Sequence, residues 1–153
     1  MKKIISIFVI LSVSFVFTSC THRYDDTLEV GRRVAATLGD GVHVYYSLAN
    51  EVDDEYMPFK LRKEMFTNTD SFPINYTVIL TERFDTVLEI GVFLSRSRSE
   101  AIDISEICLM RVREVDVWRD ISADVMIVEN LVIYYLTDSG DDLRSKIESA
   151  VDF

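Results

Sequence analysis

The chain has few of the residues that usually carry enzymatic chemistry or covalent cross-links. Of its 153 residues, only two are cysteines, two are histidines and five are glycines. Neither His22 nor His43 has a second His or Cys at metal-ligand spacing, which argues against a zinc site. No Gly-x-Ser-x-Gly motif and no glycine-rich phosphate loop is present. We therefore predict no catalytic residues, no metal centre and no cofactor, and an enzyme is the less favoured class.

Positive charge is also scarce. The chain carries 16 Lys and Arg against 26 Asp and Glu, a formal net charge of −10. Its arginines, such as Arg96 and Arg98, are scattered among acidic residues. Nucleic-acid binding needs a basic stripe, so the sequence argues against that class. The same charge balance disfavours electrostatic attachment to an anionic bilayer.

One long apolar run is present, at the N-terminus. Residues 4–17 follow the basic pair Lys2-Lys3, and Thr18-Ser19 leads from them to Cys20. The run is shorter than the roughly 20 apolar residues that span a bilayer, and it is typical of a secretory signal. Phe17-Thr18-Ser19-Cys20 resembles the bacterial lipobox. The resemblance implies that Cys20 receives a diacylglycerol, with fatty acids such as palmitate, and becomes the mature N-terminus.

The expected organisation is a signal peptide over residues 1–19, a lipidated cysteine and tether over 20–26, and a single domain over 27–153. The expected location is the extracytoplasmic face of the cell membrane, held by the lipid anchor. Ordinary secretion and an uncleaved membrane anchor are the alternatives. An acylated Cys20 leaves Cys108 without a disulfide partner. Apolar neighbours at helical spacing indicate that Cys108 is a small buried residue, with a reactive thiol as the alternative.

The first part of the domain is predicted to hold two helices around one strand. A helix begins at Asp26 or Thr27 and ends at Leu38, where Gly39 stops it. Residues 42–48 alternate as in a strand, although an irregular loop is possible. A short helix then runs from Pro58 to Phe66.

The second part is predicted to repeat the order strand, strand, helix. Strands over 74–81 and 86–94 form an antiparallel hairpin, and a helix follows from Ser97 or Ser99 to Trp118. Strands over 125–128 and 131–137 meet at Glu129-Asn130, where Asn tolerates a positive φ, and one long strand is the alternative. A last helix, capped by Asp138 or Ser139, ends at Val151.

This order predicts an α+β fold in which four antiparallel strands carry the two later helices on one face. Four apolar side chains are expected on the other face, with the two N-terminal helices as cover: Ile79, Val87, Phe93 and Tyr134. Gly91 indicates a bulge or a close backbone neighbour.

Three stretches of the domain match the pattern of a known family: Glu89-Ile-Gly-Val-Phe93, the region of Arg111, and Ala123-Asp124-Val125. Through them, residues 56–151 resemble a family of uncharacterised small lipoproteins of Gram-positive anaerobes. The resemblance implies a small extracytoplasmic domain and supplies no catalytic residues. Glu89, Phe93 and Arg111 match its pattern as binding or structural positions. The structural reading is a carboxylate at a strand edge, a packed ring, and a helix arginine that pairs with a carboxylate where helix and sheet meet.

One acidic loop offers oxygen ligands for a cation through Glu51, Asp53, Asp54 and Glu55, although it lacks the spacing and central Gly of an EF-hand. The favoured function is a non-enzymatic binding or accessory module at the cell envelope, with a protein or cell-wall component as partner. A carboxylate-dependent envelope hydrolase and a structural envelope protein are the alternatives. The sequence leaves the oligomeric state open.

Overall fold

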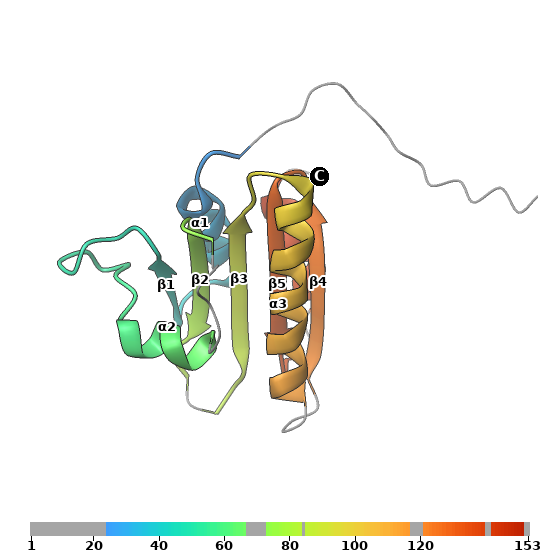
Figure 1. Cartoon of the computed structure of the whole chain (residues 1–153). Coiled ribbons are helices and arrows are strands. Elements are labelled where there is room, and N and C mark those ends of the chain that lie inside the picture. Colours follow the sequence, from blue (N-terminus) through green and yellow to red (C-terminus); the bar gives the residue numbers. More distant parts are fainter. Residues whose placement is uncertain (1–23, 67–72, 84, 117–120, 140–141, 152–153) are drawn as a thin grey trace, which may run out of the picture.

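A computed structural model describes residues 24–66, 73–83, 85–116, 121–139 and 142–151 (Figure 1). These residues form four helices and one five-stranded sheet, which confirms the predicted α+β class. In chain order the elements are α1 Thr27–Leu38, β1 Val42–Tyr46, α2 Phe59–Met65, β2 Tyr76–Thr81, β3 Leu88–Leu94, α3 Arg98–Asp116, β4 Ser122–Val128, β5 Leu131–Thr137 and α4 Leu143–Ala150.

The strands lie in the order β1-β2-β3-β5-β4, and every neighbouring pair is antiparallel. The prediction of a four-stranded sheet is wrong, because β1 pairs with β2 from Val42↔Thr81 to Tyr46↔Thr77 and adds a fifth strand. Both expected hairpins, β2–β3 and β4–β5, are present. Since β5 lies between β3 and β4, these two strands run parallel to each other, and α3 is the crossover that joins them.

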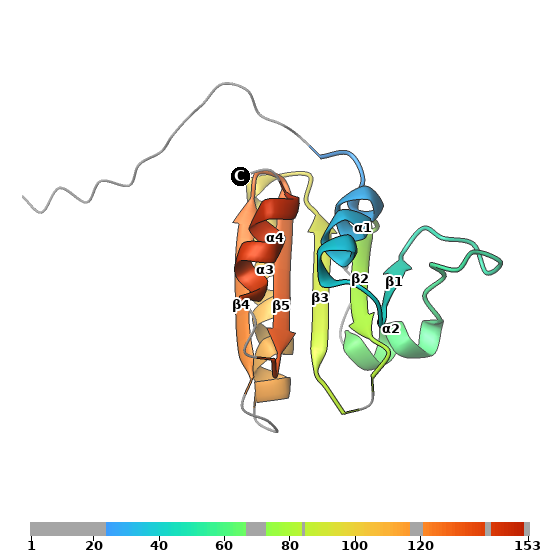
Figure 2. The same cartoon turned by 180° about the vertical axis from the view of Figure 1, so that it is seen from behind.

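Helices cover both faces of the sheet. Helices α2 and α3 lie in front of it in Figure 1, and α1 and α4 lie on the opposite face in Figure 2. The prediction that α3 and α4 share one face is therefore wrong, as is the prediction that α1 and α2 share the other. All seven residues of β5 are buried, so both faces need cover, and α3 and α4 pack on opposite sides.

Each face has its own hydrophobic cluster. The cluster under α1 and α4, here the α1/α4 cluster, includes Val34, Ile90 and Ile147. The cluster under α3, here the α3 cluster, includes Phe93, Cys108 and Tyr134. Ile79 was predicted to share the face of Phe93, but it pairs with Ile90 and belongs to the α1/α4 cluster. The alternation along β3 places Glu89, Gly91 and Phe93 toward α3.

Local signals explain where several elements begin and end. The Asp26 side chain caps α1 by accepting from the Leu28 N–H at 3.1 Å, and Gly39 ends the helix with a φ of 80°. The Ser97 hydroxyl accepts from the Glu100 N–H at 3.1 Å, which is one half of the predicted capping box, while Glu100 Oε2 accepts from the Arg96 N–H at 2.5 Å.

Two predicted details of the C-terminal part are wrong. In the β4–β5 turn the residue with positive φ is Glu129, at 53°, rather than Asn130. Helix α4 is capped by Asp142, whose carboxylate accepts from the Ser145 N–H at 3.1 Å, rather than by Asp138 or Ser139.

Candidate functional site

Two of the three positions singled out by sequence form a buried ion pair between sheet and helix. Glu89 is the second residue of β3, the central strand, and Arg111 reaches it from α3. Arg111 Nε lies 2.9 Å from Glu89 Oε1, and Arg111 Nη2 lies 2.8 Å from Glu89 Oε2. The Glu89 side chain is only 8% exposed and the Arg111 side chain 20%. This contact is the expected pairing of a helix arginine with a carboxylate at the helix–sheet seam.

Tyr134 of β5 completes this network, a role that no sequence pattern indicated. Its hydroxyl donates to Glu89 Oε1 at 2.6 Å, so the carboxylate accepts three hydrogen bonds from side chains. The hydrogen bonds to Glu89 raise the pKa of Arg111, and burial together with the charge of Glu89 raises the pKa of Tyr134. Both shifts move these groups away from neutral pH. Arg111 and Tyr134 therefore keep their protons there and are not suited to general acid–base exchange.

Phe93, the third position, lies in an aromatic stack. Its ring centroid is 5.7 Å from that of Tyr76 and 5.9 Å from that of Tyr134, while Phe66 meets it edge-on at 5.8 Å. Gly91 makes room for this stack, since a Cβ there would lie 2.1 Å from Tyr134 Cε1. The strand register continues through Gly91, so it marks a close neighbour and not a bulge. Phe93 is thus a packed ring, as its structural interpretation held.

Cys108 of α3 is buried in the same cluster, beside Ala101 and Ile104. Burial raises the pKa of its thiol, and a thiolate is the reactive form of cysteine. The interpretation as a small buried residue is confirmed.

The acidic loop does not gather its carboxylates around one point. Asp53 accepts hydrogen bonds from Asn50, and Glu55 pairs with Arg32, which lowers the pKa of Glu55. The Asp54 carbonyl contacts His43 Nε2 at 2.9 Å. Among the residues described, no group of three or more His, Cys, Asp or Glu side chains is arranged to hold a metal ion. The candidate ligands Glu51, Asp53, Asp54 and Glu55 are therefore not brought together as a set.

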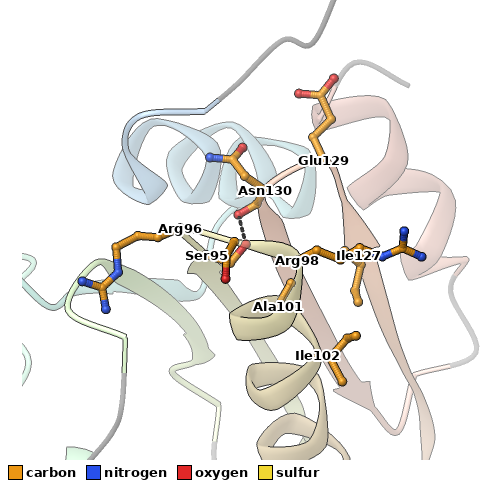
Figure 3. A pocket seen from close by; sticks show the side chains of 9 residues that line it. Ser95, Arg96, Arg98, Ala101, Ile102, Ile127, Glu129 and Asn130 are labelled. Carbon is orange, nitrogen blue, oxygen red and sulfur yellow. Dashed lines mark hydrogen bonds between the residues drawn. The ribbon is translucent and has the colours of Figure 1, made fainter. Parts of the chain in front are cut away.

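A hollow of about 670 Å³ lies where the start of α3 meets the end of β4, and sequence reasoning did not find it (Figure 3). Arg98 and Ile102 of α3 and Ile127 of β4 are among the residues that line it. Ile102 and Ile127 are 48% and 49% exposed, although both are large and apolar. Exposed apolar side chains gathered around a hollow are typical of an interaction surface. We call this hollow and the adjoining side of α3 the edge groove.

The first described residue lies at the same end of the molecule. The Tyr24 N–H donates to Asn130 Oδ1 at 2.9 Å, and Asn130 Nδ2 donates to the Tyr24 carbonyl at 2.7 Å. The Tyr24 hydroxyl also donates to the Val151 carbonyl. Since Asn130 lines the edge groove, the chain enters the domain beside it.

The remaining predicted site residue, Cys20, lies outside the described residues. Of the helices that the structure describes, none has the length and apolar character needed to cross a membrane.

Comparison of the chain with protein-family models, curated proteins and solved structures finds no match in any of the three. The resemblance to small lipoproteins of Gram-positive anaerobes therefore stays a prediction.

Proposed function

We propose that the protein is a lipid-anchored binding module on the extracytoplasmic face of the membrane, and that it engages a protein partner. The observation that carries this proposal is the edge groove, where exposed apolar side chains line a hollow beside the last strand of the sheet. Such a surface suits association with another protein, because burying exposed apolar area is favourable.

The anchor in this proposal is Cys20, at the end of the lipobox-like stretch. Only three residues separate Cys20 from Tyr24, so the four Cα–Cα steps between them span at most about 14 Å. Because Tyr24 is bonded to Asn130, an acyl chain on Cys20 would hold the edge groove close to the membrane. A partner at the same membrane would then meet the groove at high effective concentration.

The hydrolase alternative receives no support from Glu89. Both of its carboxylate oxygens accept hydrogen bonds from Arg111, and Tyr134 adds a third. A general acid or base must reach its substrate, whereas the Glu89 side chain is 8% exposed and enclosed by α3.

The anchor is tested by growing cells that express the full chain with radiolabelled palmitate. Wild type and Cys108→Ala should both incorporate label and sediment with membranes. Cys20→Ala should lose both properties, because it lacks the acylated thiol. Equal labelling of Cys20→Ala would contradict the anchor.

The binding function is tested by capturing the tagged full chain from detergent-solubilised membranes. The wild type should retain a specific protein that the unanchored Cys20→Ala control does not. Recovery of nothing above this control would contradict the proposal.

A further inference from the structure

The outer edge of β4 is unpaired and has few of the features that protect edge strands. Strand β4 is seven residues long, and its pairing within the described chain is with β5 alone. It contains no proline, and Asp124 is its single charged residue. An edge of this kind presents unpaired backbone N–H and C=O groups that can accept another strand, and natural proteins usually protect it. A strand that adds to such an edge gains affinity from main-chain hydrogen bonds.

The opposite edge of the sheet is protected. At the end of β1, the Tyr46 N–H donates to the Glu55 carbonyl at 2.7 Å, and Tyr46 forms a bridge with Tyr56. The His43 ring contacts the Asp54 carbonyl beside them. The loop after β1 thus folds back onto that edge, whereas no described segment does so at β4.

An apolar ledge follows the open edge on the α3 side. Ala123, Val125 and Ile127 alternate along β4, and the first two pack against the α3 cluster. Ile102 and Leu109 are two helical turns apart, so they share one side of α3, and Ile102 lines the edge groove together with Ile127. Leu109 is 40% exposed, close to the fractions for the two isoleucines. Alternate side chains of an added strand would rest on this ledge.

Two arginines bracket the ledge. Arg98 precedes Ile102 by four residues and Arg113 follows Leu109 by four, so each lies one turn beyond the apolar pair on the same side of α3. Both are exposed, and neither forms an ion pair with any residue that the structure describes, in a chain with ten more acids than bases. In Figure 3, Arg98 extends past Ile127 while Arg96 points to the other side of the helix. Glu106 lies between the two arginines and disfavours acid at the middle of a ligand.

The spacing of these charges sets the length of the ligand. Arg98 and Arg113 are 15 residues apart, which corresponds to about 22 Å of helix at 1.5 Å per residue. A strand covers that distance in about seven residues.

The following inference rests on the proposed function and concerns the class of its protein partner. We propose that the outer edge of β4 binds an extended segment of a partner protein as a sixth strand. The segment carries apolar side chains at alternate positions and an acidic residue at each end, about seven residues apart. The backbone of β4 supplies affinity, the apolar ledge selects the alternating side chains, and Arg98 and Arg113 select the acidic ends.

The proposal is tested with the full chain in detergent and a fluorescent peptide in which valine and threonine alternate between terminal aspartates. Fluorescence anisotropy should show binding at least about tenfold tighter than for the same peptide with lysine ends. Arg98→Glu should abolish this preference, because one end of either peptide then meets a like charge. Arg83→Glu, the same charge change after β2, should not. Circular dichroism confirms that both variants are folded.

Strand addition is tested by methylating alternate backbone nitrogens of the peptide, which leaves its side chains unchanged. Binding should fall by at least about tenfold, because main-chain hydrogen bonds to β4 are lost. Unchanged binding of the methylated peptide, or an unchanged end preference in Arg98→Glu, would overturn the proposal. So would a dimer of the full chain that Ile127→Asp dissociates, because a second copy would then occupy the edge.

Failure of this inference can be told apart from failure of the proposed function. If membranes yield the same partner with the wild type and with Ile127→Asp, the module binds elsewhere and only the inference fails. If the partner is lost with Ile127→Asp but retained by Arg83→Glu, both stand.

Discussion

On the face covered by α1 and α4, the sheet meets apolar side chains such as Val34, Ile90 and Ile147. On the face covered by α3, the sheet carries a stacked aromatic row and a buried carboxylate held by an arginine and a tyrosine. On the first face, a substitution that removes buried apolar atoms should lower the free energy of unfolding in proportion to the apolar area lost. The second depends on geometry, because a buried charge left without its partners is costly. Substitutions on the two faces should therefore fail in different ways.

Each face contains a glycine in close contact with a neighbouring side chain. Replacing each of them by alanine should give the largest difference in stability loss between the two faces. A Cβ at Gly91 would lie 2.1 Å from the Tyr134 ring, which is fixed by Phe93 and Glu89. We expect Gly91→Ala to lower the free energy of unfolding by about 4 kcal/mol or to prevent folding. Gly31→Ala meets a Thr77 methyl group at 2.4 Å and should cost about 1 to 2 kcal/mol. Urea denaturation measures both, and equal losses would contradict the contrast.

Breaking the ion pair should come next. Arg111→Ala leaves Glu89 buried with only Tyr134 and should cost about 3 to 5 kcal/mol in urea denaturation. The triple variant Glu89→Leu, Arg111→Met, Tyr134→Phe removes all three polar groups together. It should stay within about 2 kcal/mol of the wild type, because apolar residues of similar volume often replace a buried pair without loss. A triple variant as unstable as Arg111→Ala would show that the ion pair is itself strongly stabilising.

The apolar face should respond more simply. Ile147 is fully buried in the α1/α4 cluster, and Ile147→Ala should cost about 3 kcal/mol. Ile147→Val, which removes one methylene, should cost about 1 kcal/mol. The loss of stability in both Ile147 variants should be the same at pH 6 and at pH 10.5, because neither substitution removes the partner of a titratable group. Chemical denaturation at both pH values checks this.

The last expected effect concerns the Tyr134 hydroxyl. At neutral pH, Tyr134→Phe removes one hydrogen bond to Glu89 and should cost about 1 to 2 kcal/mol. The pKa of Tyr134 is raised in the folded protein, so its stabilising contribution is complete below about pH 10, the unfolded value, and is lost as the pH rises further. The stability difference between the two proteins should therefore shrink above pH 10. Other tyrosines remain in both proteins, so a constant difference would contradict the role of this hydroxyl.

The sequence predicted those features that depend on neighbouring residues. The bounds of β5, the capping of α3 by Ser97 and the end of α1 at Gly39 follow from short patterns, and all are found. The place of β1 at an edge and the split of the helices between two faces do not. They depend on pairing between distant strands, which a local pattern does not encode.

The candidate site divides in the same way. Arg111 was expected to pair with a carboxylate at the seam, and the structure identifies that carboxylate as Glu89. Tyr134 enters their network only because β5 lies beside β3 and places it opposite Gly91. The edge groove was missed because Ile102 and Ile127 lie 25 residues apart, on a helix and a strand whose contact no local pattern indicates. Their exposure follows from the position of β4 at the end of the sheet.

The insertion of β5 between β3 and β4 governs how the molecule can be assembled. When synthesis has reached the end of β4, the central strand β3 still lacks its neighbour on one side, and its hydrophobic residues there are uncovered. Strand β5 must insert between β3 and β4 before the helices on either face can pack against a complete sheet. Folding of the domain is therefore expected to be cooperative and to finish only after β5 is synthesised. A nascent polypeptide halted before Thr137 would remain a client for chaperones however complete its first four strands.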